Sequence, residues 1–120
     1  MIQNQTIVKV GDNSGVRYVR CIKVLGASKK RWAKLGEYIK ASAIEVVPKS
    51  KVRKGQVVNA IVIRLSKQIA RCSEYIRYST NAVAVLNEKF EPLGSRVFGI
   101  IAKEIKLLNP KVFAIANETI

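Results

Sequence analysis

Apolar and polar residues alternate along most of the first 90 positions, and this period of two, rich in β-branched side chains, predicts strands. Turn-forming residues separate the runs at intervals of about ten residues, a spacing that favours a small barrel over a doubly wound sheet. We expect strands at residues 6–10, 16–25, 37–47, 56–65, 75–78 and 82–86, and a hairpin-like connection carrying Lys67 and Arg71 at residues 66–73.

The same alternation assigns side chains to the two faces of each strand. In the run 16–25, one face would hold Val16, Tyr18, Ile22 and Val24, with Arg17 and Lys23 opposite. Arg20 falls on the apolar side, which indicates a bulge, a strand end or an exposed stretch. In the next strand the inward side chains would be Ile39, Ala41 and Ala43. The run 56–65 is apolar at nearly every position, as expected where both faces are covered.

The last quarter of the chain has a different period. Ile101, Ile105 and Leu108 follow the spacing i, i+4, i+7 and predict a short amphipathic helix at about residues 100–108. Asn109 and Pro110 would end that helix, and residues 111–116 alternate again as a last strand. The fold class is therefore mainly β: a small five-stranded β-barrel with a short C-terminal α-helical lobe. We expect a single domain over residues 1–120, with the barrel at about 1–93 and the lobe at about 94–120.

Charge changes the picture more than any other property. The 120 residues include 22 Lys and Arg against 8 Asp and Glu, a formal net charge of +14, while 48% of residues are hydrophobic. That composition indicates a folded body with a strongly basic surface, and its excess charge calls for a polyanionic partner. Nucleic acid is favoured over an anionic membrane surface or simple solubility, because the chain has no basic amphipathic helix and no apolar run long enough to span a membrane.

Two basic clusters in the first half of the chain are candidate phosphate-binding loops, since Gly or Pro flanks each of them. Their members are Lys29, Lys30, Arg31, Trp32 and Lys34 in the first cluster, and Lys49, Lys51, Arg53 and Lys54 in the second. Trp32 would either stack on a base or cap the barrel end as a partly buried anchor. For Tyr75 and Tyr78, core packing is favoured over stacking, and Phe98 and Phe113 are assigned to packing of the C-terminal lobe.

Nothing in the sequence indicates an enzyme, a cofactor or a metal site. Histidine is absent, which excludes a Ser-His-Asp triad and every His-ligated metal. Cys21 and Cys72 are isolated and are interpreted as reduced core residues, although their spacing leaves a disulfide open. The segment 94–99 has the GxxxxG spacing of a phosphate loop but lacks the following Lys-Ser/Thr, so we expect a turn into the helix with Arg96 exposed. Glu88 and Glu91 are interpreted as part of a solvated turn.

Several blocks in register along the whole chain resemble the bacterial and organellar L-fourteen family of large-subunit ribosomal proteins. The blocks are Met1-Ile2-Gln3-x-Gln5-Thr6, Asp12-Asn13-Ser14-Gly15, Cys21-Ile22-Lys23-Val24-Leu25-Gly26, Ala60-Ile61-Val62-Ile63-Arg64, Ile76-Arg77-Tyr78 with Asn81-Ala82, Gly94-Ser95-Arg96-Val97-Phe98-Gly99 and Lys111-Val112. Two positions depart from the family pattern. Cys72-Ser73 stands where Asp-Gly is usual, and Ala116-Asn117-Glu118 replaces Ala-Pro-Glu.

The resemblance implies a structural protein that binds large-subunit rRNA and contributes to a bridge to small-subunit rRNA on the intersubunit face. It also implies contacts with the neighbouring ribosomal proteins L-nineteen and L-three. The segment 48–53, with Arg96, would face the small subunit. A ribosome silencing factor would dock on a surface that includes Ser95, Arg96 and Lys111. The departures, without a presequence, favour the mitochondrial matrix over the bacterial cytoplasm or the chloroplast stroma.

A free-standing barrel that binds single-stranded nucleic acid is the main alternative. It rests on the same charge and on Trp32, and it predicts tight binding of isolated oligonucleotides. The barrel pattern itself does not separate these two functions, but co-migration with large ribosomal subunits would.

Overall fold

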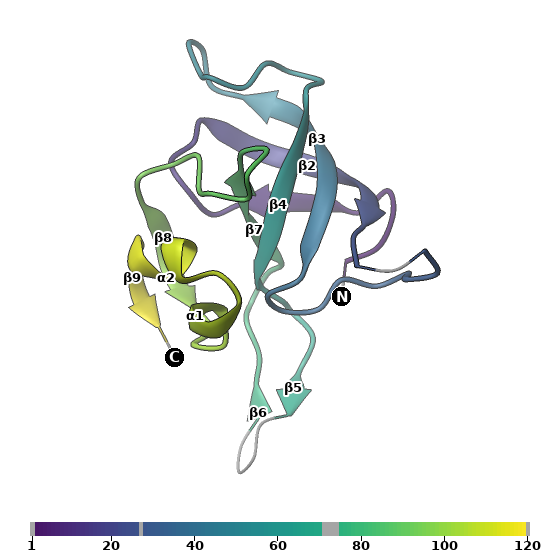
Figure 1. The fold of residues 1–120 in the computed structure, drawn as a ribbon, viewed down its shortest axis with the longest axis vertical. Coiled ribbons are helices and arrows are strands. Elements are labelled where there is room, and N and C mark those ends of the chain that lie inside the picture. Colours follow the sequence, from purple (N-terminus) through teal and green to yellow (C-terminus); the bar gives the residue numbers. More distant parts are fainter. Residues whose placement is uncertain (1, 27, 71–74, 120) are drawn as a thin grey trace.

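Five strands close into a barrel in the order β1-β2-β3-β4-β7 (Figure 1). The structure is a computed structural model that describes residues 2–26, 28–70 and 75–119. The barrel strands are β1 (Ile7–Val10), β2 (Val16–Val24), β3 (Tyr38–Val46), β4 (Val57–Arg64) and β7 (Ala82–Leu86). The predicted mainly β fold with a five-stranded barrel is confirmed, and the strands expected near 6–10, 16–25, 37–47, 56–65 and 82–86 are present within one or two residues at each end.

Parallel pairing between the first and last barrel strands closes the sheet. Lys9 lies opposite Ala82 and Val10 opposite Val83, whereas the other neighbouring strands of the barrel pair antiparallel. Closure leaves the barrel without an unpaired edge, so its shape is fixed by its own ladder and core. The loops at its two ends are thereby held at a set separation.

Strands β4 and β7 are buried on both faces, which explains their continuous apolar sequence. Val62 of β4 and Val83 of β7 belong to the cluster inside the barrel, together with the predicted inward residues of β3. Ile61 and Ile63 point the other way, into a second cluster outside the barrel. The C-terminal lobe covers that outer face.

The lobe consists of four short elements packed beside β4 and β7 (Figure 1). They are β8 (Val97–Ile101), α1 (Ile105–Leu108), α2 (Pro110–Ala114) and β9 (Ala116–Thr119), and β8 pairs parallel with β9. Arg64, at the end of β4, donates from Nη1 to the carbonyl oxygens of Phe98 at 2.7 Å and Ile100 at 3.3 Å. This guanidinium ties β8 to the barrel.

A small hairpin extends away from the barrel between β4 and β7 (Figure 1). Its strands are β5 (Ile69–Ala70) and β6 (Tyr75–Ile76), with Ile69 opposite Ile76. The predicted connection at 66–73 therefore begins as a hairpin arm in which Lys67 is exposed, while Arg71 and Cys72 lie outside the described residues. The predicted strand at 75–78 is shorter than expected.

The assignment of β2 side chains to faces is wrong in part. Tyr18 and Ile22 are 39% and 43% exposed, and the buried positions include Val19 and Cys21. Shifts of register between Tyr18 and Val19, and again between Cys21 and Lys23, change which side chains face inward. The irregularity signalled by Arg20 is real, but Arg20 itself is exposed.

The predicted helix at 100–108 is confirmed only over its last four residues, because Ile101 belongs to β8 and α1 begins at Ile105. The helical spacing arose because a strand end and a separate helix bury both isoleucines in the same outer cluster. Asn109 does end α1, but its Oδ1 accepts from the Val112 backbone N–H at 3.3 Å and starts α2, with Pro110 in the first turn. The strand predicted at 111–116 is therefore mostly helix.

Aromatic packing differs from expectation at two positions. Tyr75 is 70% exposed and Phe98 47% exposed, so neither is a core residue. Tyr78 is half-buried, and Phe113 packs against the outer cluster as predicted. Cys21 is a buried free cysteine, and burial raises the pKa of its thiol. No described helix is long and apolar enough to cross a membrane.

Candidate nucleic-acid interface

The two basic clusters lie at opposite ends of β3. The loop 25–37 joins β2 to β3, and the loop 47–56 joins β3 to β4 (Figure 1). The nine residues of β3 place these loops about 30 Å apart along the strand direction. The structure therefore confirms both clusters as loops but does not bring them into one patch.

The loop 47–56 is folded on itself around one apolar anchor, Val52, which is only 3% exposed. The Ser50 hydroxyl donates to the Val52 carbonyl oxygen and accepts from the Val52 backbone N–H at 3.1 Å. The backbone N–H of Gly55 donates to the Ala43 carbonyl oxygen at 2.6 Å, which fastens the loop to β3. The loop backbone is thus fixed before any partner binds.

The cations of this loop all point outward. Lys49, Lys51, Arg53 and Lys54 are exposed. Among the residues that the structure describes, no Asp or Glu forms an ion pair with any of these four cations. Four uncompensated charges on a braced loop suit contacts with phosphate groups, whose spacing is regular.

The loop 25–37 is anchored in a similar way, through Ala33. Its backbone N–H donates to the Ile2 carbonyl oxygen at 2.7 Å, and the Ile2 backbone N–H returns the bond at 3.3 Å. Ala33 and Ile2 are fully buried. On either side of this anchor Lys29, Arg31 and Lys34 are exposed.

Lys30 behaves differently from the other predicted contacts, because its Nζ forms an ion pair with Glu37 and it is half-buried. Glu37 also accepts the Lys34 backbone N–H at its Oε1, 3.0 Å away. Lys30 therefore stabilises the loop, and it is less free to neutralise a phosphate than its neighbours. Glu37, the only acidic residue between Asp12 and Glu45, was not identified as part of the site from the sequence.

Trp32 is 45% exposed, between exposed cations on the loop surface. An indole with half its surface in water is available to stack on a base while its buried half holds it in place. Both functions considered for Trp32, anchor and stacking platform, fit this partial burial.

Ser95 and Arg96 are held beside the turn 12–15 by one side chain, that of Asn13. Its Oδ1 accepts the backbone N–H groups of Ser95 at 2.8 Å and Arg96 at 3.0 Å, and its Nδ2 donates to Ser95 Oγ at 2.9 Å. Arg96 is exposed, as predicted, but the segment leads into β8 and not into a helix. This positioning role of Asn13 could not be predicted from the sequence, because Ser95 and Arg96 lie more than 80 residues away along the chain.

Lys111 lies at the start of α2, where its Nζ is 3.2 Å from Glu91 Oε1. The ion pair is exposed, so it contributes at most about 1 kcal/mol and does not lock Lys111 away from a partner. Among the described residues, no hydrogen bond or ion pair joins Lys111 to Ser95 or Arg96.

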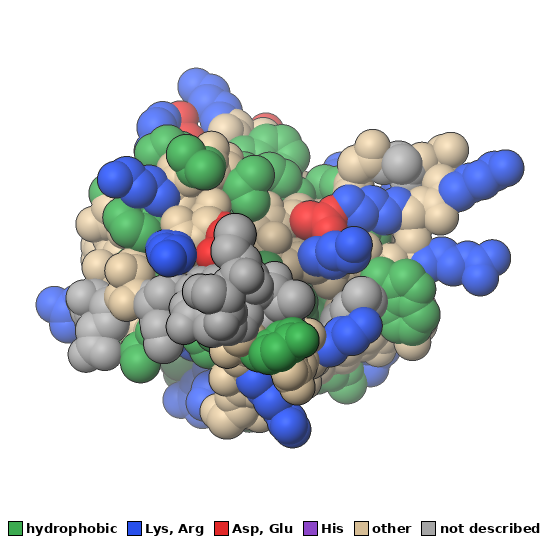
Figure 2. Space-filling view, turned by 90° about the horizontal axis from the view of Figure 1, so that it is seen from below, with side chains coloured by type: hydrophobic (Ala, Val, Ile, Leu, Met, Phe, Trp, Pro, Cys, Tyr) green, Lys and Arg blue, Asp and Glu red, His purple; other side chains and the backbone are tan. Residues whose placement is uncertain are grey.

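Positive side chains outnumber acidic ones on the face of the molecule drawn in Figure 2. Figure 2 shows Lys and Arg side chains projecting around most of the outline, with few acidic atoms between them. In the described part of the chain, no group of three Cys, Asp or Glu side chains gathers in a way that could hold a metal ion. The surface chemistry is that of an anion-binding protein.

A family model described as Ribosomal protein L14p/L23e matches residues 1–120. The chain belongs to this family. The resemblance found in the separate sequence blocks is thereby confirmed. L14-family proteins are structural components of the large ribosomal subunit that bind rRNA, and they are not enzymes. Their place is the ribosome.

Family membership gives the basic surface of this L14-family protein its partner, rRNA. The exposed cations of the two loops and of the segment 95–96 lie on this surface, and the barrel sets the separation of the two loops.

Proposed function

We propose that this L14-family protein binds large-subunit rRNA through the loop segments 29–34 and 49–54, as two separate phosphate contacts. The observation that carries the proposal is the placement of two braced, exposed cationic loops at opposite ends of β3. The rigid barrel between the loops would set the distance between the two RNA segments that they bind. Recognition would then depend on RNA shape, since Lys and Arg contacts to phosphates carry little base information.

Within the first loop, Lys29, Arg31 and Lys34 would neutralise phosphates and Trp32 would stack. Lys30, paired with Glu37, would hold the loop in shape. Within the second loop the phosphate contacts would be Lys49, Lys51, Arg53 and Lys54.

Three variants test this assignment, each removing three positive charges by substitution to alanine. The first changes Lys49, Lys51 and Lys54, and the second changes Lys29, Arg31 and Lys34. The matched control changes Lys67, Lys89 and Lys103, which are exposed outside both loops. Binding to purified large-subunit rRNA is measured between 50 and 200 mM salt. The slope of log K against log salt should fall by about 2–3 in each loop variant, since each lost phosphate contact removes about 0.7–0.9.

The control variant should keep most of the wild-type slope. Equal losses in all three variants would mean that overall charge, and not these loops, holds the RNA, and the assignment would be rejected.

We also infer that the segment 48–53 and Arg96 face the small subunit and contribute to a bridge with its rRNA. Support comes from a shared hollow in which Lys49, Ser50 and Lys51 adjoin Gly94 and Ser95, next to Arg96. Arg96→Ala should weaken association of the two subunits while leaving incorporation into the large subunit unchanged, as measured by gradient sedimentation. Unchanged subunit association would contradict the bridge.

The remaining partners are proposed from the resemblance to the family. They are L-nineteen, L-three and a silencing factor that docks on Ser95, Arg96 and Lys111, in a mitochondrial ribosome. Cross-linking of the intact ribosome tests the neighbours, and cell fractionation tests the compartment. Retention of silencing-factor binding after Arg96→Ala and Lys111→Ala would exclude that surface.

A further inference from the structure

Two hollows of different chemistry share a wall formed by Lys51 and Leu93. The first has a volume of about 330 Å³ and the second about 360 Å³. Both are at the small end of ligand sites, which span about 300–1,000 Å³. Neither hollow was identified from the sequence, because Leu93, Asn59 and Val52 come from separate segments.

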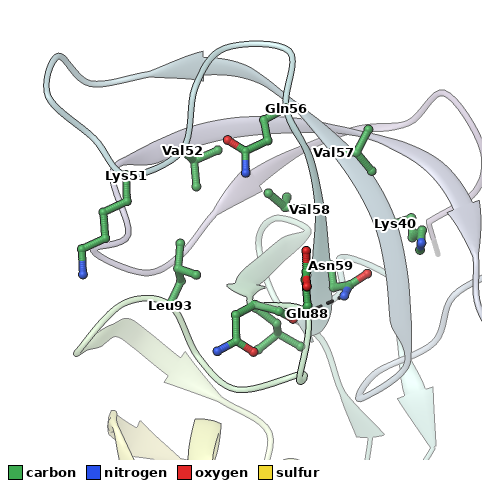
Figure 3. A pocket seen from close by; sticks show the side chains of 11 residues that line it. Lys40, Lys51, Val52, Gln56, Val57, Val58, Asn59, Glu88 and Leu93 are labelled. Carbon is green, nitrogen blue, oxygen red and sulfur yellow. Dashed lines mark hydrogen bonds between the residues drawn. The ribbon is translucent and has the colours of Figure 1, made fainter.

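The first hollow has an apolar floor and a polar edge (Figure 3). Val52, Val58 and Leu93 surround the same space, with Asn59 and Glu88 on one side. Asn59 Nδ2 donates to the Asn87 carbonyl oxygen at 3.3 Å, which fixes the amide and leaves its Oδ1 as an acceptor. An apolar floor next to amide and carboxylate groups suits the face and the edge of a nucleobase.

The second hollow is lined by Lys49 and Lys51 and by three serine hydroxyls, and none of its lining residues is acidic. Ser14 and Ser50 already donate their hydroxyl protons, to Asp12 Oδ1 and to the Val52 carbonyl oxygen. Ser95 Oγ accepts from Asn13 Nδ2, so its own proton remains available to a bound oxygen. Two ammonium groups and one free hydroxyl donor suit a phosphate.

We propose that the two hollows together hold one unpaired nucleotide of the bound RNA, with its base in the first hollow and a neighbouring phosphate in the second. Charge favours this orientation: Lys40, Lys51 and the acidic Glu88 line the first hollow, whereas Lys49 and Lys51 line the second with no acidic residue beside them. The inference rests on the rRNA-binding function proposed above and adds recognition of a base that is not stacked in a helix. An apolar side chain of a protein partner would fill the first hollow, but it would not account for the lysines and serines that line the second.

Titration of the ¹⁵N-labelled protein with three small probes tests the proposal, with chemical shifts as the readout. The probes are adenosine, ribose 5-phosphate and adenosine 5′-monophosphate. Adenosine should shift amides around Val58 and Asn59, and ribose 5-phosphate should shift those around Lys49 and Ser95. The complete nucleotide should shift both sets and bind more tightly than either part.

Asn59→Leu removes the polar edge at nearly constant volume, and Asn4→Leu makes the same change at an exposed residue outside both hollows. Asn59→Leu should abolish the adenosine shifts, leave the ribose 5-phosphate shifts unchanged and weaken large-subunit rRNA binding about 5- to 100-fold at an unchanged salt slope. Asn4→Leu should behave as wild type.

The proposal is overturned if adenosine causes no chemical shift changes. It is also overturned if ribose 5-phosphate alone causes all the shift changes that the complete nucleotide causes. Shifts that also spread over the loop segment 29–34 would indicate unspecific anion binding and would overturn the proposal as well. None of these results touches the rRNA-binding function itself, which the alanine variants of the loops test separately by their salt slopes.

Discussion

At the scale of the residue, Asp12 is the one buried carboxylate among the described side chains of a protein that has 22 Lys and Arg. Asp12 is 7% exposed, and its two oxygens connect the first turn to β7. Oδ2 accepts the Val85 backbone N–H at 2.8 Å, and Oδ1 accepts the Ser14 backbone N–H at 3.1 Å. Burial raises the pKa of Asp12, and these hydrogen bonds offset only part of that effect.

The raised pKa predicts how stability depends on pH. Because Asp12 binds its proton more tightly in the folded state, its contribution to stability falls as pH rises from its ordinary pKa of 3.8 through the folded value. Asp12→Asn does not titrate and loses one accepted hydrogen bond, a constant cost of about 1–3 kcal/mol. The free energies of unfolding of the variant and the wild type are measured by urea titration from pH 3 to 7. The value for the variant minus the value for the wild type should therefore increase as pH rises.

Taking the difference in unfolding free energy between the two proteins cancels the contributions of the other titrating groups. A difference that stays flat, or that falls with pH, would mean that the hydrogen bonds outweigh burial at this carboxyl.

Which way a side chain points is the property that the sequence predicted least well. Ile39, Ala41 and Ala43 are buried as alternation requires, but the same rule failed for Tyr18 and Ile22. A register shift leaves little mark in the sequence, yet it moves the side chains that follow it to the other face until a second shift restores the alternation, as it does before Val24. Arg20 was the only residue in this strand that indicated an irregularity from the sequence.

At the scale of the element, β8 depends on a contact between Arg64 and two glycines. A Cβ on Gly99 would lie 2.7 Å from Arg64 Nη1, and one on Gly11 would lie 2.5 Å from Arg64 Nη2. The guanidinium is not free to move aside, because it holds the Phe98 and Ile100 carbonyl oxygens. Its half-buried position lowers the pKa of Arg64.

Gly99→Ala should therefore destabilise the protein more than Gly55→Ala. Both glycines have positive φ, 77° and 87°, so alanine at either carries a similar left-handed cost of about 1–2 kcal/mol. Nothing lies within 4 Å of a Cβ on Gly55, whereas Gly99→Ala also displaces Arg64. We expect an additional loss of about 1.5–3 kcal/mol from these charged hydrogen bonds, measured by chemical denaturation. Equal losses in the two variants would show that Arg64 does not hold β8.

The barrel strands were predictable as elements, and the C-terminal elements were not. Long alternating runs carry a clear period, whereas β8, α1 and α2 have five, four and five residues, too short to establish one. Ile101, Ile105 and Val112 share one buried cluster although they lie in three different elements. Tertiary contacts decided the local structure there.

At the scale of the whole molecule, the fold determines where the charged loops lie relative to one another. Composition and Gly/Pro punctuation were sufficient to find both basic loops, since those signals are local. They could not show that the loops lie at opposite ends of β3, that Glu37 pairs with Lys30, or that Asn13 holds Ser95 and Arg96. Those relations exist only after the barrel has closed.

We expect folded rRNA of the large ribosomal subunit to neutralise the excess cations of this protein. Sedimentation of a gently prepared cell extract tests this expectation, with the tagged chain followed across the gradient. The chain should co-migrate with large subunits at moderate salt and be released as salt is raised, because its contacts are chiefly to phosphates. Migration as a free protein at the top of the gradient under the same conditions would contradict the expectation.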